Sequence, residues 1–266
     1  MKKYMILQTP GILFTAVCLS LVSCYPVGTV VDPYYVAPER QDQNTYYVPA
    51  APHSPLLTEK GDINFNILRS SGSKFNGAEL QLAYMPGKHV GIGMSYSGGG
   101  HKEGEPQAMN YSRFELMSGY VKKLRNGWHF ESYGGLGTGG INNTHYTGKS
   151  HIKLNHFFLQ PAIVVSNDKQ TVQFGIASRF TGVHFNVNEI AFDYDREVIS
   201  FDRINTLVDN PFHVMWEPSL IFRAGWKNFL FTIQYSHSSD LSGPAVYGST
   251  DNFSFGVSVR GNTKKK

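Results

Sequence analysis

The sequence predicts an all-β fold: an antiparallel up-and-down transmembrane β-barrel of about ten strands, preceded by an N-terminal Pro-rich tether. Three observations support this prediction. Apolar and polar residues alternate with a period of two from Asp62 onwards. Tight turns alternate with longer connections between the alternating segments. The chain also contains 18 Phe, 15 Tyr and 27 Gly, a composition typical of proteins with many strands and turns.

Residues 1–23 have the features of an export signal. Lys2 and Lys3 precede an apolar run from Ile12 to Val22, which at 11 residues is shorter than the roughly 20 that a transmembrane helix needs. The sequence Leu21-Val22-Ser23-Cys24 resembles the lipobox of bacterial lipoproteins. This resemblance implies cleavage before Cys24 and a lipid on Cys24. The alternative is an ordinary signal with a Cys near its end by chance.

Cysteine content and charge limit the function further. Cys18 lies inside the signal and Cys24 would be acylated, so the mature chain would contain neither a free thiol nor a disulfide. The formal charge of +4 falls to +2 when the two Lys of residues 1–23 are removed (4 − 2). A nearly neutral chain gives no reason to expect a nucleic-acid partner. No cofactor or metal site is expected either.

Residues 24–61 form a separate compositional block without apolar periodicity. Proline removes backbone donors and favours extended chain, so this block is expected to be a semi-rigid tether between the lipid and the folded domain. The pair Tyr46-Tyr47 could dock on a partner or on the domain itself, but a plain spacer is the preferred interpretation. The prolines are Pro26, Pro33, Pro38, Pro49, Pro52 and Pro55.

The barrel is predicted over residues 62–261, followed by a short basic tail at 262–266. Its alternation is clear in the first strand, where Ile63, Phe65 and Ile67 share one face. The predicted strands are 62–70, 77–85, 90–97, 111–123, 128–137, 151–165, 170–187, 212–225, 229–238 and 252–260.

The connections add a second regularity. Four of them are tight, at 86–88, 125–127, 166–169 and 226–228. They alternate with five longer ones, at 71–76, 98–110, 138–150, 188–211 and 239–251. Transmembrane barrels combine short periplasmic turns with longer extracellular loops. Both ends of the chain are therefore expected on the periplasmic side, where a lipid on Cys24 would enter the inner leaflet of the outer membrane.

Charged residues within the strands help to decide which face of the predicted sheet is exposed to water. In a narrow membrane barrel such residues can pair across the lumen, whereas on a soluble, lipocalin-like barrel they would form the outer surface. Aromatic residues near the tight turns resemble an interfacial girdle, which favours the membrane barrel. Over residues 62–260 the architecture resembles small outer-membrane meander barrels of the OmpA and OmpX type. The expected luminal charges are Arg113, Glu115, Glu131, Arg179, Glu217 and Arg223.

The longest connection contains a helical pattern. Val198, Ile204 and Leu207 recur at helical spacing, which predicts a short amphipathic helix that caps the barrel mouth or, alternatively, docks a partner. Upstream, Asp193, Asp195 and Glu197 lack the Gly and Glu positions of an EF-hand calcium loop, so they are interpreted as a solvated surface.

One stretch could carry chemistry. His237, Ser239 and Asp251 resemble the catalytic residues of outer-membrane lipid A deacylases, in which a His-x-Ser-Asn at a strand end precedes an acidic residue. The resemblance implies that His237 is a general base, Ser239 a nucleophile and Asp251 the group that orients the imidazole. Asp240 departs from the pattern, because its carboxylate replaces the Asn and would repel an oxyanion.

The preferred function is that of a non-catalytic, lipid-anchored outer-membrane barrel. It would act through its extracellular loops or as an accessory subunit, in contact with outer-membrane lipids and other outer-membrane proteins. The alternatives are an outer-membrane acyl ester hydrolase that uses Ser239 and a soluble periplasmic barrel that binds a lipid.

Overall fold

A computed structural model of the chain describes residues 44–102, 108–145, 148–192, 198–226, 228–243 and 250–264. The predicted signal at 1–23, Cys24 and the acidic residues of 193–197 lie outside the described residues. The same holds for residues 24–43 of the expected tether and for the last two residues of the basic tail.

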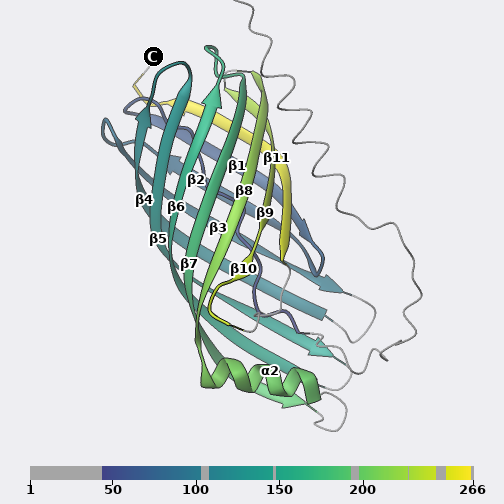
Figure 1. Cartoon of the computed structure of the whole chain (residues 1–266). Coiled ribbons are helices and arrows are strands. Elements are labelled where there is room, and N and C mark those ends of the chain that lie inside the picture. Colours follow the sequence, from purple (N-terminus) through teal and green to yellow (C-terminus); the bar gives the residue numbers. More distant parts are fainter. Residues whose placement is uncertain are drawn as a thin grey trace, which may run out of the picture. The chain divides into compact units, whose positions relative to one another are not determined.

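The described chain is almost entirely β-structure, with one helix between the seventh and eighth strands (Figure 1). The elements are β1 (Asp62–Gly72), β2 (Phe75–Tyr84), β3 (Val90–Lys102), β4 (Ala108–Lys123), β5 (Trp128–His145), β6 (Gly148–Ser166), β7 (Val172–Phe192), α2 (Val198–Asp209), β8 (Phe212–Trp226), β9 (Phe229–His237), β10 (Ser239–Asp240) and β11 (Asp251–Asn262).

The strands form a closed antiparallel barrel. Each strand from β1 to β9 pairs with its neighbour in the sequence, and β11 pairs with both β9 and β1, which closes the sheet. The two-residue β10 continues β9 along the edge of β8, after a break at Ser238. The predicted antiparallel up-and-down barrel and its ten main strands are therefore confirmed. Because β1 and β11 pair with each other, the described sheet has no free first or last strand, although β7 runs on past His184, its last residue paired with β8.

The connections differ partly from the prediction. The four tight turns occur where they were expected, but two of the predicted longer loops are tight as well. β1 and β2 are joined through Ser73 and Lys74, and β5 runs to His145 before β6 begins at Gly148. The apolar alternation ends before the strands do, because the outward side chains near these tips are polar. The simple rule of short turns against long loops was therefore wrong at 71–76 and 138–150.

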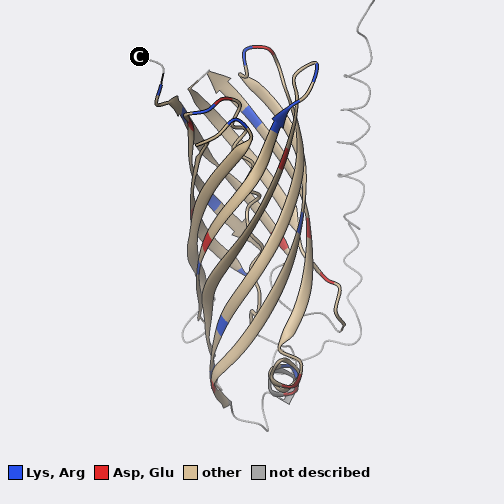
Figure 2. Ribbon diagram, turned by 90° about the vertical axis from the view of Figure 1, so that its left-hand side faces the viewer, with Lys and Arg blue, Asp and Glu red and all other residues tan. Residues whose placement is uncertain are grey.

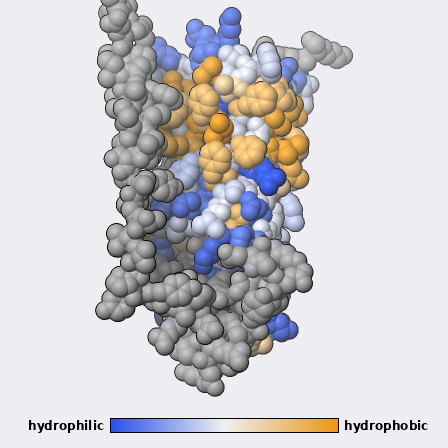
Figure 3. Space-filling view, turned by 90° about the vertical axis from the view of Figure 1, so that its right-hand side faces the viewer, coloured by the Kyte–Doolittle hydropathy of each residue, from blue (hydrophilic) through white to orange (hydrophobic). Residues whose placement is uncertain are grey.

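The outer face of the barrel carries a continuous apolar belt. Every main strand contributes at least one large exposed apolar side chain to it, and Figure 3 shows the belt on the half of the barrel nearer the tight turns. A surface of this extent is far larger than soluble proteins expose. Trp128, Trp226 and Phe229 lie at its tight-turn edge. One belt residue per strand is Ile67, Leu80, Ile92, Leu116, Leu136, Leu159, Ile176, Phe222, Phe231 and Phe255.

Several strands continue well beyond this belt. β6 has 19 residues and β7 has 21, whereas a strand needs about 9–11 residues to cross a bilayer. The outward residues of the extensions are polar and exposed, for example Asn142, Lys153 and Asn186. The wall formed by the longer strands therefore projects past the belt on the side opposite the tight turns.

α2 lies at this projecting end, as Figure 1 shows. Ile204 and Leu207 are buried in a cluster with luminal residues that include Phe185 and Met215, whereas Val208 is exposed. The predicted helix and its capping position at the mouth agree with this packing. Among the described residues, no helix is long and apolar enough to cross a membrane.

The docking of α2 can be tested with one buried and one exposed residue of the same helix. Ile204→Ala should cost about 2–5 kcal/mol, because the cavity removes packing against the luminal cluster. The readouts are urea unfolding in detergent micelles and protease cleavage of the segment between β7 and β8. Val208→Ala is the control and should change stability by no more than about 0.5 kcal/mol. Equal effects of the two substitutions would show that α2 does not pack as described.

Candidate functional site in the barrel lumen

The lumen is filled by residues 44–57, an extended segment that precedes the first strand (Figure 1). Every residue of this segment is buried, and among its side chains Tyr46 and Leu57 are each only 1% exposed. Its contacts reach inward-facing side chains of β2, β4, β5, β6, β8, β9 and β11. The barrel interior is therefore a packed core and not an open channel.

This finding corrects the spacer interpretation for the described part of the tether. Tyr46 and Tyr47 dock on the domain itself, which was the less favoured alternative. Prolines are suited both to a free spacer and to a segment buried in the lumen, because proline has no backbone N–H group. Pro49, Pro52 and Pro55 offer no N–H group, so fewer donors remain to be satisfied where the segment has no neighbouring strand. The boundaries predicted at residues 24 and 61 remain predictions.

Two side-chain amides take the place of a neighbouring strand. Asn143 of β5 accepts a hydrogen bond from the Thr45 N–H at 2.9 Å and donates to the Thr45 carbonyl at 3.1 Å. Gln160 of β6 does the same for His53, at 3.4 Å and 2.8 Å. Each amide therefore satisfies both backbone groups of one residue, as a paired strand would.

The middle of the segment is held by charged and polar groups. Arg113 donates to the Val48 carbonyl at 2.8 Å, and Glu217 accepts from the Tyr47 hydroxyl at 3.1 Å. Glu79 accepts from the Ala51 N–H at 3.2 Å. Asn252 of β11 donates to the Pro49 carbonyl at 2.9 Å. Ser236 of β9, five strands around the barrel from Arg113 on β4, donates to the Ala50 carbonyl at 3.0 Å. The backbone is thus fixed from opposite walls of the barrel.

Four of the predicted luminal charges form one connected ionic network. Arg179 binds Glu115 through two nitrogens, at 2.6 Å and 3.1 Å, and its Nε lies 3.2 Å from Glu217. Arg113 lies 3.4 Å from Glu115, and His156 reaches the same carboxylate at 2.9 Å. In Figure 2 charged bands appear partway along the strands as well as at the barrel ends. Bidentate geometry and mutual pairing make burial of these charges tolerable.

The other two predicted charges also lie in the lumen, but neither forms an ion pair with another described residue. Glu131 accepts a hydrogen bond from Ser54 at 2.5 Å, which adds a further contact between the segment and the wall. Arg223 is fully buried and donates to Gln173 at 3.5 Å, while Arg260 donates to the same oxygen at 2.8 Å. The structure therefore places all six residues in the lumen but links only four of them through ion pairs.

Apolar layers close the lumen on both sides of the ionic network. At the α2 end, Tyr46, Tyr47 and Val48 pack in one cluster with inward residues of the strands and with the helix. Toward the tight turns, Leu57 packs with Met85, Met117 and Tyr133. The segment thus supplies apolar side chains to each layer, which excludes water from the pairs between them.

The suggested catalytic residues are only partly brought together. His237 pairs with Asp251 across β9 and β11, with Nδ1 at 3.0 Å from the carboxylate. No hydrogen bond joins His237 to Ser239 in the described structure, and Ser239 lies opposite Trp216 of β8. Asp240 binds His213 at 2.7 Å, so it has a structural partner at the mouth. An orienting His–Asp pair is therefore present, but the contact to the nucleophile is not made.

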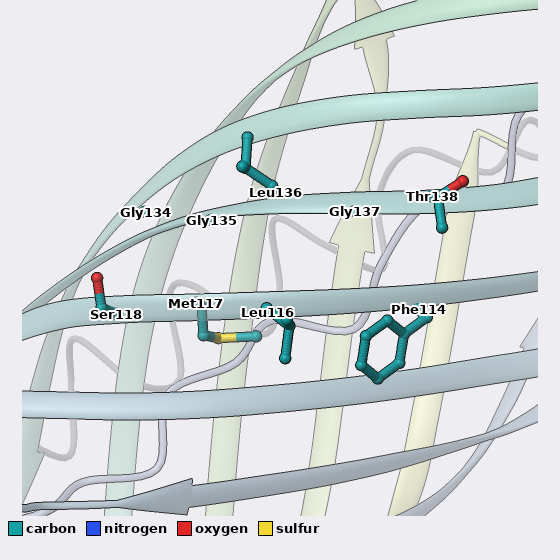
Figure 4. A pocket seen from close by; sticks show the side chains of 9 residues that line it. All are labelled: Phe114, Leu116, Met117, Ser118, Gly134, Gly135, Leu136, Gly137 and Thr138. Atoms are coloured by element: carbon teal, nitrogen blue, oxygen red, sulfur yellow. The ribbon is translucent and has the colours of Figure 1, made fainter.

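A shallow groove of about 680 Å³ lies on the outer wall over β4 and β5. Figure 4 shows Leu116 and Leu136 in the middle of the groove, with Ser118 and Gly134 toward one end and Phe114 and Thr138 toward the other. Its lining contains no charged or His side chain, so it offers no acid–base chemistry. Within the described part of the chain, no group of three or more His, Cys, Asp and Glu residues is arranged to hold a metal ion.

The ionic network can be tested by removing its central cation. Arg179→Ala should cost about 3–5 kcal/mol, because it leaves two buried carboxylates without their main counter-charge. Unfolding in detergent micelles measures this loss. Lys149→Ala is the matched control, because Lys149 pairs with Glu189 at 2.5 Å on the exposed surface, where an ion pair contributes about 0–1 kcal/mol. An Arg179→Ala variant as stable as this control would contradict the network.

Comparisons with known proteins give only distant likenesses. No family model matches the chain, and no curated protein matches its sequence. The translocator domain of the autotransporter NalP from Neisseria meningitidis aligns at a TM-score of 0.42 and 9% identity, over 75% of this chain and 87% of that chain. OccAB2 from Acinetobacter baumannii aligns at a TM-score of 0.22 and 10% identity, over 75% of this chain and 68% of that chain. These likenesses are too weak to carry an argument, so the functional conclusion rests on the geometry.

Proposed function

We propose that the protein is an outer-membrane β-barrel that is sealed by its own N-terminal segment and works without catalysis. It acts through its loop-bearing end, as a surface component or as an accessory subunit of an outer-membrane assembly. The observation that carries this proposal is the complete burial of residues 44–57 inside the lumen.

The distribution of apolar and charged residues supports the membrane setting. Large apolar side chains face outward in every main strand, while the buried charges face inward. A soluble barrel requires the opposite arrangement, because its apolar face forms the core. A lipid bilayer satisfies the outward belt, and the closed sheet satisfies all strand backbone groups that the bilayer cannot.

The filled lumen supports a sealed rather than a conducting barrel. The lumen contains the inward side chains of the strands and, in addition, the strand-like residues 44–57, every one of which is buried. The same filling argues against the soluble lipid-binding alternative. Tyr46, Tyr47 and Val48 occupy the apolar layer in which such a ligand would bind.

The projecting part of the wall supports action at the α2 end. Its polar outer surface extends past the belt and carries α2 and the connection after β9. A lipid on Cys24 and contacts with other outer-membrane proteins remain part of the proposal. Outer-membrane lipids are the partners expected around the belt.

Sealing can be measured in planar lipid bilayers with the purified chain. The full chain should insert and show no stable open conductance, because residues 44–57 fill the lumen. Deleting residues 25–57 should produce steady conductance steps of a water-filled barrel. Steady conductance of the full chain would overturn the sealed-barrel proposal, and failure to insert would overturn the membrane setting.

A second candidate function is hydrolysis of an acyl ester in the outer leaflet. The pairing of His237 with Asp251 favours it, since this is how a triad orients its imidazole. A rotation of the Ser239 side chain or binding of a substrate would have to complete the contact with the nucleophile.

Mass spectrometry of lipid A tests this activity in cells that lack the protein, contain it, or contain Ser239→Ala. A hydrolase predicts loss of an acyl chain only in cells with the unchanged protein. Ser242→Ala, in the same connection, is the control and should behave like the unchanged protein. Identical lipid A in all strains would exclude the enzyme and would leave the sealed-barrel proposal intact.

A further inference from the structure

We infer that residues 44–57 carry the chain across the membrane inside the barrel, so that the chain before Asn44 leaves on the α2 side, opposite the C-terminal end of the barrel. This inference rests on the proposed membrane setting and adds a topology to it. It also departs from the expectation that both chain ends lie on the tight-turn side.

The tight-turn end of the segment is fixed by contacts to the first strand. Asp62 accepts hydrogen bonds from the Thr58 and Glu59 N–H groups, each at 2.8 Å. The Gly61 N–H binds the Met85 carbonyl at 2.8 Å, at the start of the turn between β2 and β3. Asn262 at the end of β11 donates to Asp62 at 2.6 Å. The barrel therefore begins and ends at the same rim, as the sequence predicted.

The other end of the segment lies at the opposite rim. Ser150 donates to the Asn44 side chain at 3.1 Å, and Asn143 holds Thr45. Both wall residues flank the tip of the β5–β6 hairpin, which lies past the apolar belt. Between the two ends the contacts advance in order, from Glu217 at Tyr47 and Ala50, to Gln160 at His53, to Glu131 at Ser54.

The length of the segment agrees with a complete crossing. Residues 44–57 can span about 45 Å when extended at roughly 3.3 Å per residue, and a hydrocarbon core is about 30 Å thick. A return through lipid outside the barrel is excluded for extended chain, because its backbone groups would stay unsatisfied. The chain before Asn44 therefore remains on the α2 side.

If the tight turns face the periplasm, the α2 side of the barrel faces the outside of the cell. A lipid on Cys24 would then insert into the outer leaflet, not the inner one. The protein would then be held in the membrane in two ways: by the barrel, which spans it, and by acyl chains inserted from the cell surface. The surface open to partners would include α2 and the neighbouring connections.

Cysteine labelling of intact cells with a membrane-impermeant maleimide tests the topology. The full-length variants are Gln41→Cys, Asp209→Cys at the exposed end of α2, and Lys264→Cys beyond β11, and the unchanged chain is the control. We expect positions 41 and 209 to be labelled in intact cells, and to the same extent after lysis. Labelling at position 264 should appear only after lysis. Position 41 labelled together with position 264, and not with 209, would overturn the inference.

The same experiment separates the inference from the proposed membrane setting. Position 264 labelled in intact cells, with 41 and 209 protected, would reverse the barrel and refute the proposed orientation, yet it would keep the crossing. Trypsin added to intact cells gives a second readout without any change in the lumen. It should cut after Arg40, and Arg40→Gln should abolish that cut. An uncut chain whose α2 end is accessible would refute the crossing.

Discussion

The structure depends on one requirement: an extended chain buried without a neighbouring strand must still have its backbone hydrogen bonds made. In the lumen these bonds come from side chains, most completely from Asn143 and Gln160, which each pair with both backbone groups of one residue. An unmade bond to a buried amide costs roughly 1–3 kcal/mol. The polar inward face of the barrel is therefore a binding surface for its own chain. Its Asn, Gln, Glu and Arg side chains serve that purpose more than they line a path for water.

The ionic network belongs to the same requirement. Glu115 and Arg179 lie too deep to be solvated, and each is stabilised because its partners approach from different strands. Tyr47 and the Ala50 N–H complete the coordination of Glu217 from the segment. Wall and segment are thus interdependent: removing the segment leaves Glu217 with fewer donors, and removing Arg179 leaves Glu217, which holds the segment, without its counter-charge. The two apolar layers, one toward α2 and one toward the tight turns, shield this coupled set of charges from water.

The strands of the barrel wall could be predicted from the sequence, whereas the segment that fills the lumen could not. Alternation of residues such as Ile63, Phe65 and Ile67 is a local signal, so the strands and their inward charges could be predicted one by one. The position of residues 44–57 is set by contacts such as Tyr47 to Glu217, which are 170 residues apart and leave no periodic trace. Proline-rich chain is extended in either setting, so its composition could not distinguish a free spacer from a buried segment. Asn143 and Gln160 were missed because a single amide on a polar face has no distinguishing pattern. For the same reason the predicted set at His237, Ser239 and Asp251 could be placed on adjoining strands, but its side-chain contacts could not be derived.

The buried segment also has a consequence for the order in which the molecule assembles. The seam between β1 and β11 joins residues such as Asp62 and Asn262, which are 200 apart in the chain, so it is the slowest contact to find. If the seam closed first, the preceding chain would have to be pulled through a completed ring that is already narrow. If the open sheet curls around residues 44–57 instead, the segment serves as a template on which the inward side chains align before closure. Assembly by the second route makes the last step a zipping of one seam. Escape of the segment is then limited by the rate at which that seam reopens.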